Sequence, residues 1–264
     1  MIETTLTYMA AMPERPVYYL YEPPAGVPWR NTKGDRQRMP VHDARQLTGP
    51  SLDREGFRLA RLVTSADDLY DPATVRDVYY GEVERLVRDV TGAVRVLAFD
   101  HNVRRADKRG RAADVQGPVR YAHNDYTERS SPQRVRDLLP DEADALLRRR
   151  FAVINVWKPI RGPVQDAPLA FCDAQSIRSG DLVATDLRYR ERTGEVYSMK
   201  FNREHRWFYY PNMQADEALL LKCFDSDPQR ARFTAHTAFD DPNAPADASP
   251  RESIEVRTLA FFAA

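Results

Sequence analysis

The C-terminal half of the chain is a succession of short strand-like segments, and this pattern constrains the fold more than any other feature. Seven runs rich in aliphatic, β-branched and aromatic residues are separated by Pro, Gly, Asp and Asn: AVINVWKP, PLAFCDA, DLVATDL, VYSMKFN, HRWFYYP, EALLLKCFDS and SIEVRTLAFF. Many short strands with turn residues between them are typical of an all-β barrel or a double-sheet jelly roll. We therefore expect a mainly β fold with flanking helices.

Two helices are predicted before these strands. Pro72 can occupy the first turn of one helix, whose apolar residues fall on a single stripe that ends at Gly92. A second helix is expected in LPDEADALLRRRF, because Asp141 and Glu142 suit its N-terminal end and the arginines suit its C-terminal end. Both helices would pack outside the β core.

The organisation of the chain indicates one domain. Its 264 residues can bury a sizeable core, and we find neither an internal repeat nor a low-complexity tract. We predict a single domain over residues 1–264. Within it, residues 1–94 would form an N-terminal buttress of mixed strands and helix, and residues 95–264 the β core.

Composition excludes several classes of partner and compartment. The 39 basic and 39 acidic residues cancel, so charge gives no reason to expect binding to nucleic acid or to an anionic membrane. No run of eighteen apolar residues is present, and the N-terminus lacks the pattern of a secretory signal. The two cysteines, Cys172 and Cys223, lie in apolar runs, which favours buried reduced thiols. We expect a soluble, cytoplasmic protein.

The only His-x-Asp triplet in the chain, His123-Asn124-Asp125, is a candidate metal motif. On a strand, residues i and i+2 point to the same face, so His123 and Asp125 would project together. Two histidines and one carboxylate, with further coordination positions open, suit non-heme Fe(II). The residues alone leave the second histidine open among four candidates: His42, His101, His205 and His236.

The strand-like segment that follows His236 carries a row of polar residues at every second position. They are Arg251, Ser253, Glu255 and Arg257. If this face lines the mouth of a barrel, its arginines can hold a dicarboxylate near a metal. Ile254 and Val256 occupy the opposite face, and the pattern alone does not decide which face points inward.

Several motifs, in order, resemble a known family. They are HNDYT, RRRFAVINVWKPIRGPVQDAPLAFCDA, HRWFYYPNMQADEALLLKCFDS, HTAFDDP and PRESIEVRTLAFF, and they cover roughly residues 95–264. This series resembles the AsaB/CmcJ family of hydroxylase/desaturases, which includes gibberellin-desaturase-like proteins and the small chain associated with cephamycin 7-methoxylation. The family is similar to the non-heme Fe(II)/2-oxoglutarate-dependent dioxygenases, whose fold is a double-stranded β-helix, a cupin-like jelly roll.

The resemblance implies a set of site residues and cofactors. The implied metal ligands are His123, Asp125 and His236. The C5 carboxylate of 2-oxoglutarate would bind Arg251, with Ser253 beside it, while Arg257 is a second candidate or a substrate contact. The implied cofactors are Fe(II), 2-oxoglutarate as cosubstrate, and O2.

Five further residues are expected to line a substrate pocket. Asn155, Trp157 and Lys158 stand together in NVWKP, where the lysine offers a cation to a carboxylate. Trp157 in the core and Lys158 in solvent is an equally good interpretation. His205 and Trp207 begin an aromatic run, and His205 is also the rival of His236 as third ligand, although a place at the pocket rim suits it better.

The function that these features favour is an Fe(II)/2-oxoglutarate-dependent oxygenase. It would hydroxylate, desaturate or otherwise oxidise a small specialised metabolite at an unactivated C–H bond. One alternative is an accessory subunit on the same barrel that works with a companion biosynthetic enzyme. Another is a cupin-like metallohydrolase, which would not need Arg251. A homo-oligomer is compatible with the sequence, which does not identify the substrate.

Overall fold

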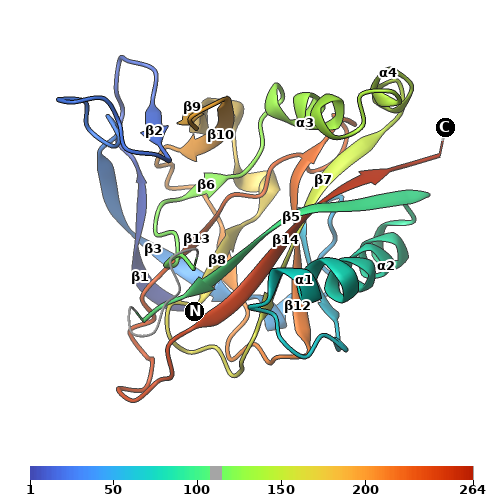
Figure 1. The fold of residues 1–264 in the computed structure, drawn as a ribbon. Helices are drawn as coiled ribbons and strands as arrows, with labels where there is room; N and C mark the ends of the chain where they lie inside the picture. Colours follow the sequence, from blue (N-terminus) through green and yellow to red (C-terminus); the bar gives the residue numbers. More distant parts are fainter. Residues whose placement is uncertain (108–114, 264) are drawn as a thin grey trace.

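The protein consists of two β-sheets with helices outside them, as the computed structural model shows (Figure 1). The structure describes residues 1–107 and 115–263. The larger sheet has nine strands in the order β1 (Ile2–Met9), β3 (Gly34–Asp43), β11 (Trp207–Tyr209), β8 (Leu169–Cys172), β13 (His236–Ala238), β6 (His123–Asn124), β10 (Thr193–Met199), β9 (Leu182–Arg188) and β2 (Val17–Tyr19). The smaller sheet has five, in the order β4 (Phe57–Arg61), β12 (Glu217–Asp225), β7 (Phe151–Pro159), β14 (Glu252–Phe261) and β5 (Arg95–Arg105). Each of the seven predicted C-terminal runs contains a strand, so the mainly β prediction is confirmed.

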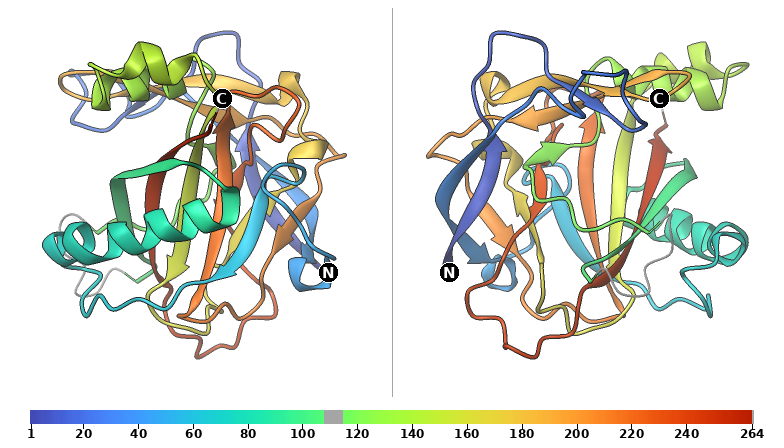
Figure 2. Two further views of the ribbon diagram at one scale, coloured as in Figure 1. Left: turned by 90° about the vertical axis from the view of Figure 1, so that its right-hand side faces the viewer. Right: turned by 60° about the vertical axis from the view of Figure 1, so that its left-hand side comes forward.

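One long helical segment covers the outer face of the five-stranded sheet. It comprises α1 (Pro72–Thr74), a π-helical stretch, η2 (Val75–Tyr79), and α2 (Tyr80–Thr91). The Asp71 side chain caps its start, and Gly92 ends it in the left-handed conformation that glycine adopts without strain. Figure 2 shows α2 lying across the sheet, as the sequence predicted.

The remaining helices are short. The second predicted helix is present only as α4 (Ala143–Leu147), and it is preceded by α3 (Ser130–Leu138), which the sequence analysis did not identify. Three 3-10 turns complete the helical elements: η1 (Ala44–Gln46), η3 (Ala174–Ser176) and η4 (Ser179–Asp181). No helix in the described part of the chain is long and apolar enough to cross a membrane.

The N-terminal third of the chain is joined to the β core more closely than a buttress would be. β1 and β3 pair with each other, β3 pairs with β11 in the nine-stranded sheet, and β4 pairs with β12 in the five-stranded sheet. The buttress expected over residues 1–94 thus contributes strands to both sheets, because their backbone groups are satisfied by pairing with core strands. The helical segment does lie outside. The single domain over residues 1–264 stays a prediction.

The two faces of the five-stranded sheet differ in character. β14 pairs with β7 so that Val256 lies opposite Val156, and Arg257 opposite Asn155. The valine face packs against the helical segment in one apolar cluster that includes Tyr79 and Val83. Because side chains alternate along a strand, the arginine face points the other way, towards the nine-stranded sheet.

Candidate metal centre

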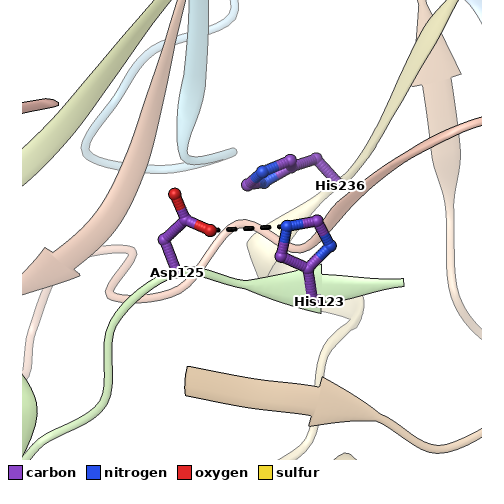
Figure 3. Close-up of side chains that lie close together, drawn as sticks. All are labelled: His123, Asp125 and His236. Carbon is purple, nitrogen blue, oxygen red and sulfur yellow. Dashed lines mark ion pairs between the residues drawn. The ribbon is translucent and has the colours of Figure 1, made fainter. Parts of the chain in front are cut away.

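His123, Asp125 and His236 meet on the inner side of the nine-stranded sheet (Figure 3). β6 and β13 are antiparallel neighbours with His123 directly opposite His236, and their rings are 4.5 Å apart between centroids. Asp125 follows β6 immediately. One potential ligand atom of each residue lies within 4.8 Å of the others, so two segments far apart in the sequence converge on one point.

Backbone hydrogen bonds fix the orientation of both imidazoles. Nδ1 of His123 lies 2.7 Å from the carbonyl oxygen of Tyr121, and Nδ1 of His236 lies 3.3 Å from that of Thr234. A carbonyl can only accept a hydrogen bond, so each Nδ1 carries a proton, and Nε2 is the nitrogen of each ring that can bind a metal. A metal-binding histidine needs this arrangement, with Nδ1 protonated and Nε2 given to the metal.

The carboxylate of Asp125 is held by one oxygen only. Its Oδ2 accepts hydrogen bonds from Nδ2 of Asn155 at 2.8 Å and from Nε of Arg257 at 2.9 Å. Its Oδ1 lies 3.4 Å from Nε2 of His123, on the side where the histidines meet. The three residues therefore offer Nε2, Oδ1 and Nε2 to one point, which fits a divalent metal bound by a 2-His-1-carboxylate triad.

Asn124, between His123 and Asp125, positions the loops around the triad. It is fully buried, and its Nδ2 donates to the carbonyls of Tyr126 at 2.7 Å and Cys223 at 2.8 Å. Its Oδ1 accepts from the backbone N–H of Thr234, two residues before His236, at 3.2 Å. Sequence analysis gave Asn124 no role, because its partners are remote in the chain.

Electrostatics prepare the triad for a cation. Burial, and then the neighbouring His123, lower the pKa of His236 to about 4, so this imidazole is neutral at pH 7. Burial alone would raise the pKa of Asp125, but the positive Arg257 and the hydrogen bond from His123 outweigh burial and hold it well below its usual range. Neutral His236 and ionised Asp125 are the forms of these side chains that bind a metal.

Arg257 is fully engaged in holding the carboxylates of the site. Its nitrogens donate to three different residues: Nε to Asp125, Nη1 to Asp100 at 2.8 Å, and Nη2 to Glu255 at 3.2 Å. Burial would lower the pKa of Arg257, but these negative neighbours raise it well above its usual range. No nitrogen of this guanidinium is left without an acidic partner.

Arg251, which directly precedes β14, has a different environment from that of Arg257. It is 3% exposed, and its Nη1 donates to the carbonyl of Ala167. Its Nε has no hydrogen-bond partner among the residues that the structure describes, and the guanidinium lies 5.6 Å from the centre of the Trp157 ring. Burial, and then the nearby Arg104, lower the pKa of Arg251 to about 9. A buried, unpartnered N–H is costly unless a ligand completes it.

Two of the five expected pocket residues share the face of the site. Asn155 lies opposite Arg257, and Trp157 lies opposite Glu255, in the pairing of β7 with β14. On the nine-stranded sheet, His236 lies opposite Phe171, and Phe171 lies opposite Phe208. These two phenylalanines therefore form the apolar wall beside His236. Sequence analysis could not distinguish Phe208 from its neighbours in HRWFYYP.

Lys158, in contrast, points away from the triad, which contradicts the expectation for it. It lies opposite Ile254 on the outer face of the five-stranded sheet, and its Nζ donates to the carbonyl of Ala215. There it lines a separate cavity of about 330 Å³. Since Trp157 points inward, the next residue of the strand must point outward.

His205 and Trp207 are also directed away from the triad. Trp207 lies opposite Cys172, and its Nε1 donates to the hydroxyl of Tyr8 at 2.7 Å, in an apolar cluster on the other face of the nine-stranded sheet. His205 stacks on the same tyrosine, and its Nε2 lies 3.1 Å from a carboxylate oxygen of Asp181. The expectation that these two residues line the substrate pocket is wrong, and His205 is not a third ligand.

Comparisons with known proteins agree with this geometry. Residues 6–261 match the family model described as an oxidoreductase/YMDC permease-like domain. The chain is 33% identical to the Fe(II)/2-oxoglutarate-dependent dioxygenase nvfI of Aspergillus novofumigatus, with 93% of this chain and 90% of that protein covered. It is 34% identical to the hydroxylase/desaturase efuI of Hormonema carpetanum, with 87% and 85% covered. A solved structure of the iron and alpha-ketoglutarate-dependent endoperoxidase NvfI superposes with a TM-score of 0.90 at 30% identity, covering 100% of this chain and 98% of that one.

Proposed function

The chain belongs to the family of Fe(II)/2-oxoglutarate-dependent hydroxylase/desaturases, and on this premise we propose that it oxidises a small specialised metabolite at an unactivated C–H bond. Its fold is the double-stranded β-helix of these enzymes, and it is a non-heme iron dioxygenase that depends on iron and 2-oxoglutarate. The sequence motifs predicted this family. The substrate, and the choice between hydroxylation, desaturation and rearrangement, belong to the proposal.

The observation that carries the proposal is the triad with its three free ligand atoms. Nε2 of His123, Oδ1 of Asp125 and Nε2 of His236 would hold the iron, because every other polar atom of these side chains is already hydrogen-bonded within the protein. Fe(II) bound there, with 2-oxoglutarate and O2, supplies the oxidising power to remove hydrogen from an unactivated C–H bond, while 2-oxoglutarate becomes succinate and CO2.

The contribution of the protein is to orient the reactants and exclude water. Asn155 and Arg257 hold Asp125 so that only one oxygen faces the metal. Arg251, whose Nε lacks a partner among the described residues, would bind the C5 carboxylate of 2-oxoglutarate, with Ser253 on the same face. Arg257 is the poorer candidate for this role, since all its nitrogens already have acidic partners.

The substrate would enter on the face of the triad. Phe171 and Phe208 supply apolar contacts beside His236, while Asn155 and Trp157 stay proposed contacts on the opposite sheet. A partly apolar metabolite fits these walls. Small-molecule oxidation also accounts for the intact triad better than an accessory role does, because a scaffold without chemistry has no need of three free ligand atoms. A companion enzyme and a homo-oligomer stay predictions.

An anaerobic titration tests the proposal. Fe(II) and then 2-oxoglutarate are added to metal-free protein while the visible spectrum is recorded. We expect a weak metal-to-ligand charge-transfer band that is absent from His123→Ala protein. The Arg251→Gln variant should need a much higher 2-oxoglutarate concentration for the same band. Fe(II) binding without any band would contradict the role of 2-oxoglutarate. If Arg251→Gln needed no more 2-oxoglutarate than the wild type, Arg257 would become the candidate for binding the C5 carboxylate.

A further inference from the structure

A second arginine that has no acidic partner among the described residues lies near Arg251. Arg104 is on β5, and it lies directly opposite Ser253 in the pairing of β5 with β14. Residues directly opposite in an antiparallel pair share a face, so Arg104 and Ser253 both point to the inner side of the sheet. Arg104 was not among the site residues expected from the sequence, because only the register with β14 brings it there.

The contacts of Arg104 leave much of its guanidinium available. Its Nη1 donates to Oε1 of Gln116 at 3.2 Å and to the carbonyl of Gly117 at 2.9 Å. Its Nε and Nη2 donate to none of the residues that the structure describes, and none of their carboxylates lies within 4.0 Å of it. Arg257, four residues along β14 from Ser253 and on the same inner face, has three such partners.

Arg104 places a second positive charge near Arg251. Burial lowers the pKa of Arg104, which the negative Glu255 partly offsets, and Arg104 is the charged group that contributes most to the lowered pKa of Arg251. Two cations near each other in a poorly solvated site repel, and an anion bound between them offsets that cost. The arrangement therefore indicates the place of a ligand anion rather than a structural ion pair.

We propose that Arg104 is a second donor to the C5 carboxylate of 2-oxoglutarate, completing with Arg251 and Ser253 a three-residue carboxylate site. This inference rests on the proposed function. A carboxylate accepts several hydrogen bonds, and guanidinium groups match its geometry with two parallel N–H donors. Arg104 thus adds a donor from β5, the neighbour of β14, which carries Ser253 and directly follows Arg251.

The position along β14 matches the length of the cosubstrate. Glu255, the inner-face residue nearest the histidines, has a carboxylate oxygen 4.0 Å from Nε2 of His236. Ser253 and Arg104 lie two residues further along, which is about 7 Å at the rise of a β-strand. This separation is comparable with an extended five-carbon dicarboxylate, so the end that chelates the metal and the C5 carboxylate can be held at once.

The test compares two 2-oxo acids. 2-Oxoglutarate and 2-oxovalerate share the end that chelates a metal, but only the first has a C5 carboxylate. Their dissociation constants are measured anaerobically on the Fe(II) protein by the charge-transfer band, and by calorimetry on the Mn(II) protein. In Arg104→Gln we expect the Kd of 2-oxoglutarate to rise about tenfold to a hundredfold, the loss of charge-assisted hydrogen bonds. The Kd of 2-oxovalerate should stay unchanged.

Arg105→Gln is the matched control. Arg105 is the next residue of β5, points to the other face and pairs with Asp107, so its removal should alter neither constant. Arg104→Lys keeps the positive charge but lacks the two parallel N–H donors of a guanidinium. Its Kd for 2-oxoglutarate should fall between those of the wild type and Arg104→Gln. Arg104→Lys also serves if Arg104→Gln does not fold.

The outcomes separate this inference from the proposed function. A wild-type protein that binds neither 2-oxo acid overturns both. Wild-type binding of 2-oxoglutarate that Arg104→Gln leaves unchanged overturns the inference alone. So does an equal weakening of both 2-oxo acids, since this would place the effect at the metal end or in the fold.

Discussion

On β14, neighbouring side chains meet two different environments although nearly the whole strand is buried. Ile254, Val256 and Ala260 pack into the apolar cluster beneath α2. The alternate residues of the strand, Ser253, Glu255 and Arg257, face the triad. Burial is therefore almost the same on both faces, and only the partners of each side chain distinguish the face that holds the fold together from the face that does the chemistry.

The difference lies in how each face offsets the cost of burial. An apolar side chain is stabilised by leaving water, by roughly 1.5–3 kcal/mol for a full-sized aliphatic residue. A buried charge is tolerated only with partners, as Arg257 has in its three carboxylates. Arg251 and Arg104 lack such partners among the described residues. On the inner face, incomplete pairing of charged groups thus indicates where a ligand binds, whereas the outer face is covered mainly by apolar side chains.

The largest effect is expected from removing a triad ligand on the inner side. His236→Ala should abolish stoichiometric Fe(II) binding and all 2-oxoglutarate turnover, because two ligands remain where a facial triad needs three. Its melting temperature without metal should stay close to that of the wild type. Metal analysis after Fe(II) loading, with succinate release as the second readout, decides the matter. Full turnover by His236→Ala protein would show that the triad is assigned wrongly.

The outer face should show the opposite behaviour. Ile254→Ala leaves a cavity beneath α2 and should lower the free energy of unfolding by about 2–5 kcal/mol. The folded fraction should bind 2-oxoglutarate as the wild type does. Ser253→Ala, the neighbour on the inner face, is the matched variant: it should cost little stability and weaken 2-oxoglutarate binding. Thermal and urea unfolding measure the free energy of unfolding, and anaerobic titration measures 2-oxoglutarate binding. Equal effects of the two variants on both quantities would contradict the assignment of different roles to the two faces.

A smaller effect is expected at Asn155, which supports a ligand without touching the metal. Asn155→Ala removes the hydrogen bond from Nδ2 to Oδ2 of Asp125 but leaves the bond from Arg257. Loss of such a supporting residue typically weakens metal binding about tenfold to a hundredfold. Competition of Fe(II) with a chromogenic chelator measures the change. Unaltered affinity would mean that Arg257 alone suffices to orient Asp125.

The parts of this fold and site that the sequence could predict depend on local patterns. Short strand-like runs and the i, i+2 spacing of His123 and Asp125 are local, and both predictions agree with the geometry. Local sequence does not show which face of β7 points inward, since every residue of the strand is buried and polar and apolar residues do not alternate along it. Only the register with β14 directs Trp157 inward and Lys158 outward. The same limit concealed Arg104.

The smallest effect on the site is expected from Trp207, and this variant tests the assignment of faces on the nine-stranded sheet. Trp207→Phe removes the hydrogen bond to the Tyr8 hydroxyl and some buried volume, which should cost about 1–2 kcal/mol of stability. Fe(II) and 2-oxoglutarate binding should not change, because the indole lies on the face away from His236. Phe208→Leu is the matched variant on the triad side. Since Phe208 belongs to the wall beside His236, this change should alter the rate of succinate formation without substrate while leaving stability less affected. If Trp207→Phe changed the spectrum of the Fe(II) and 2-oxoglutarate complex and Phe208→Leu did not, β11 would present its other face to the metal.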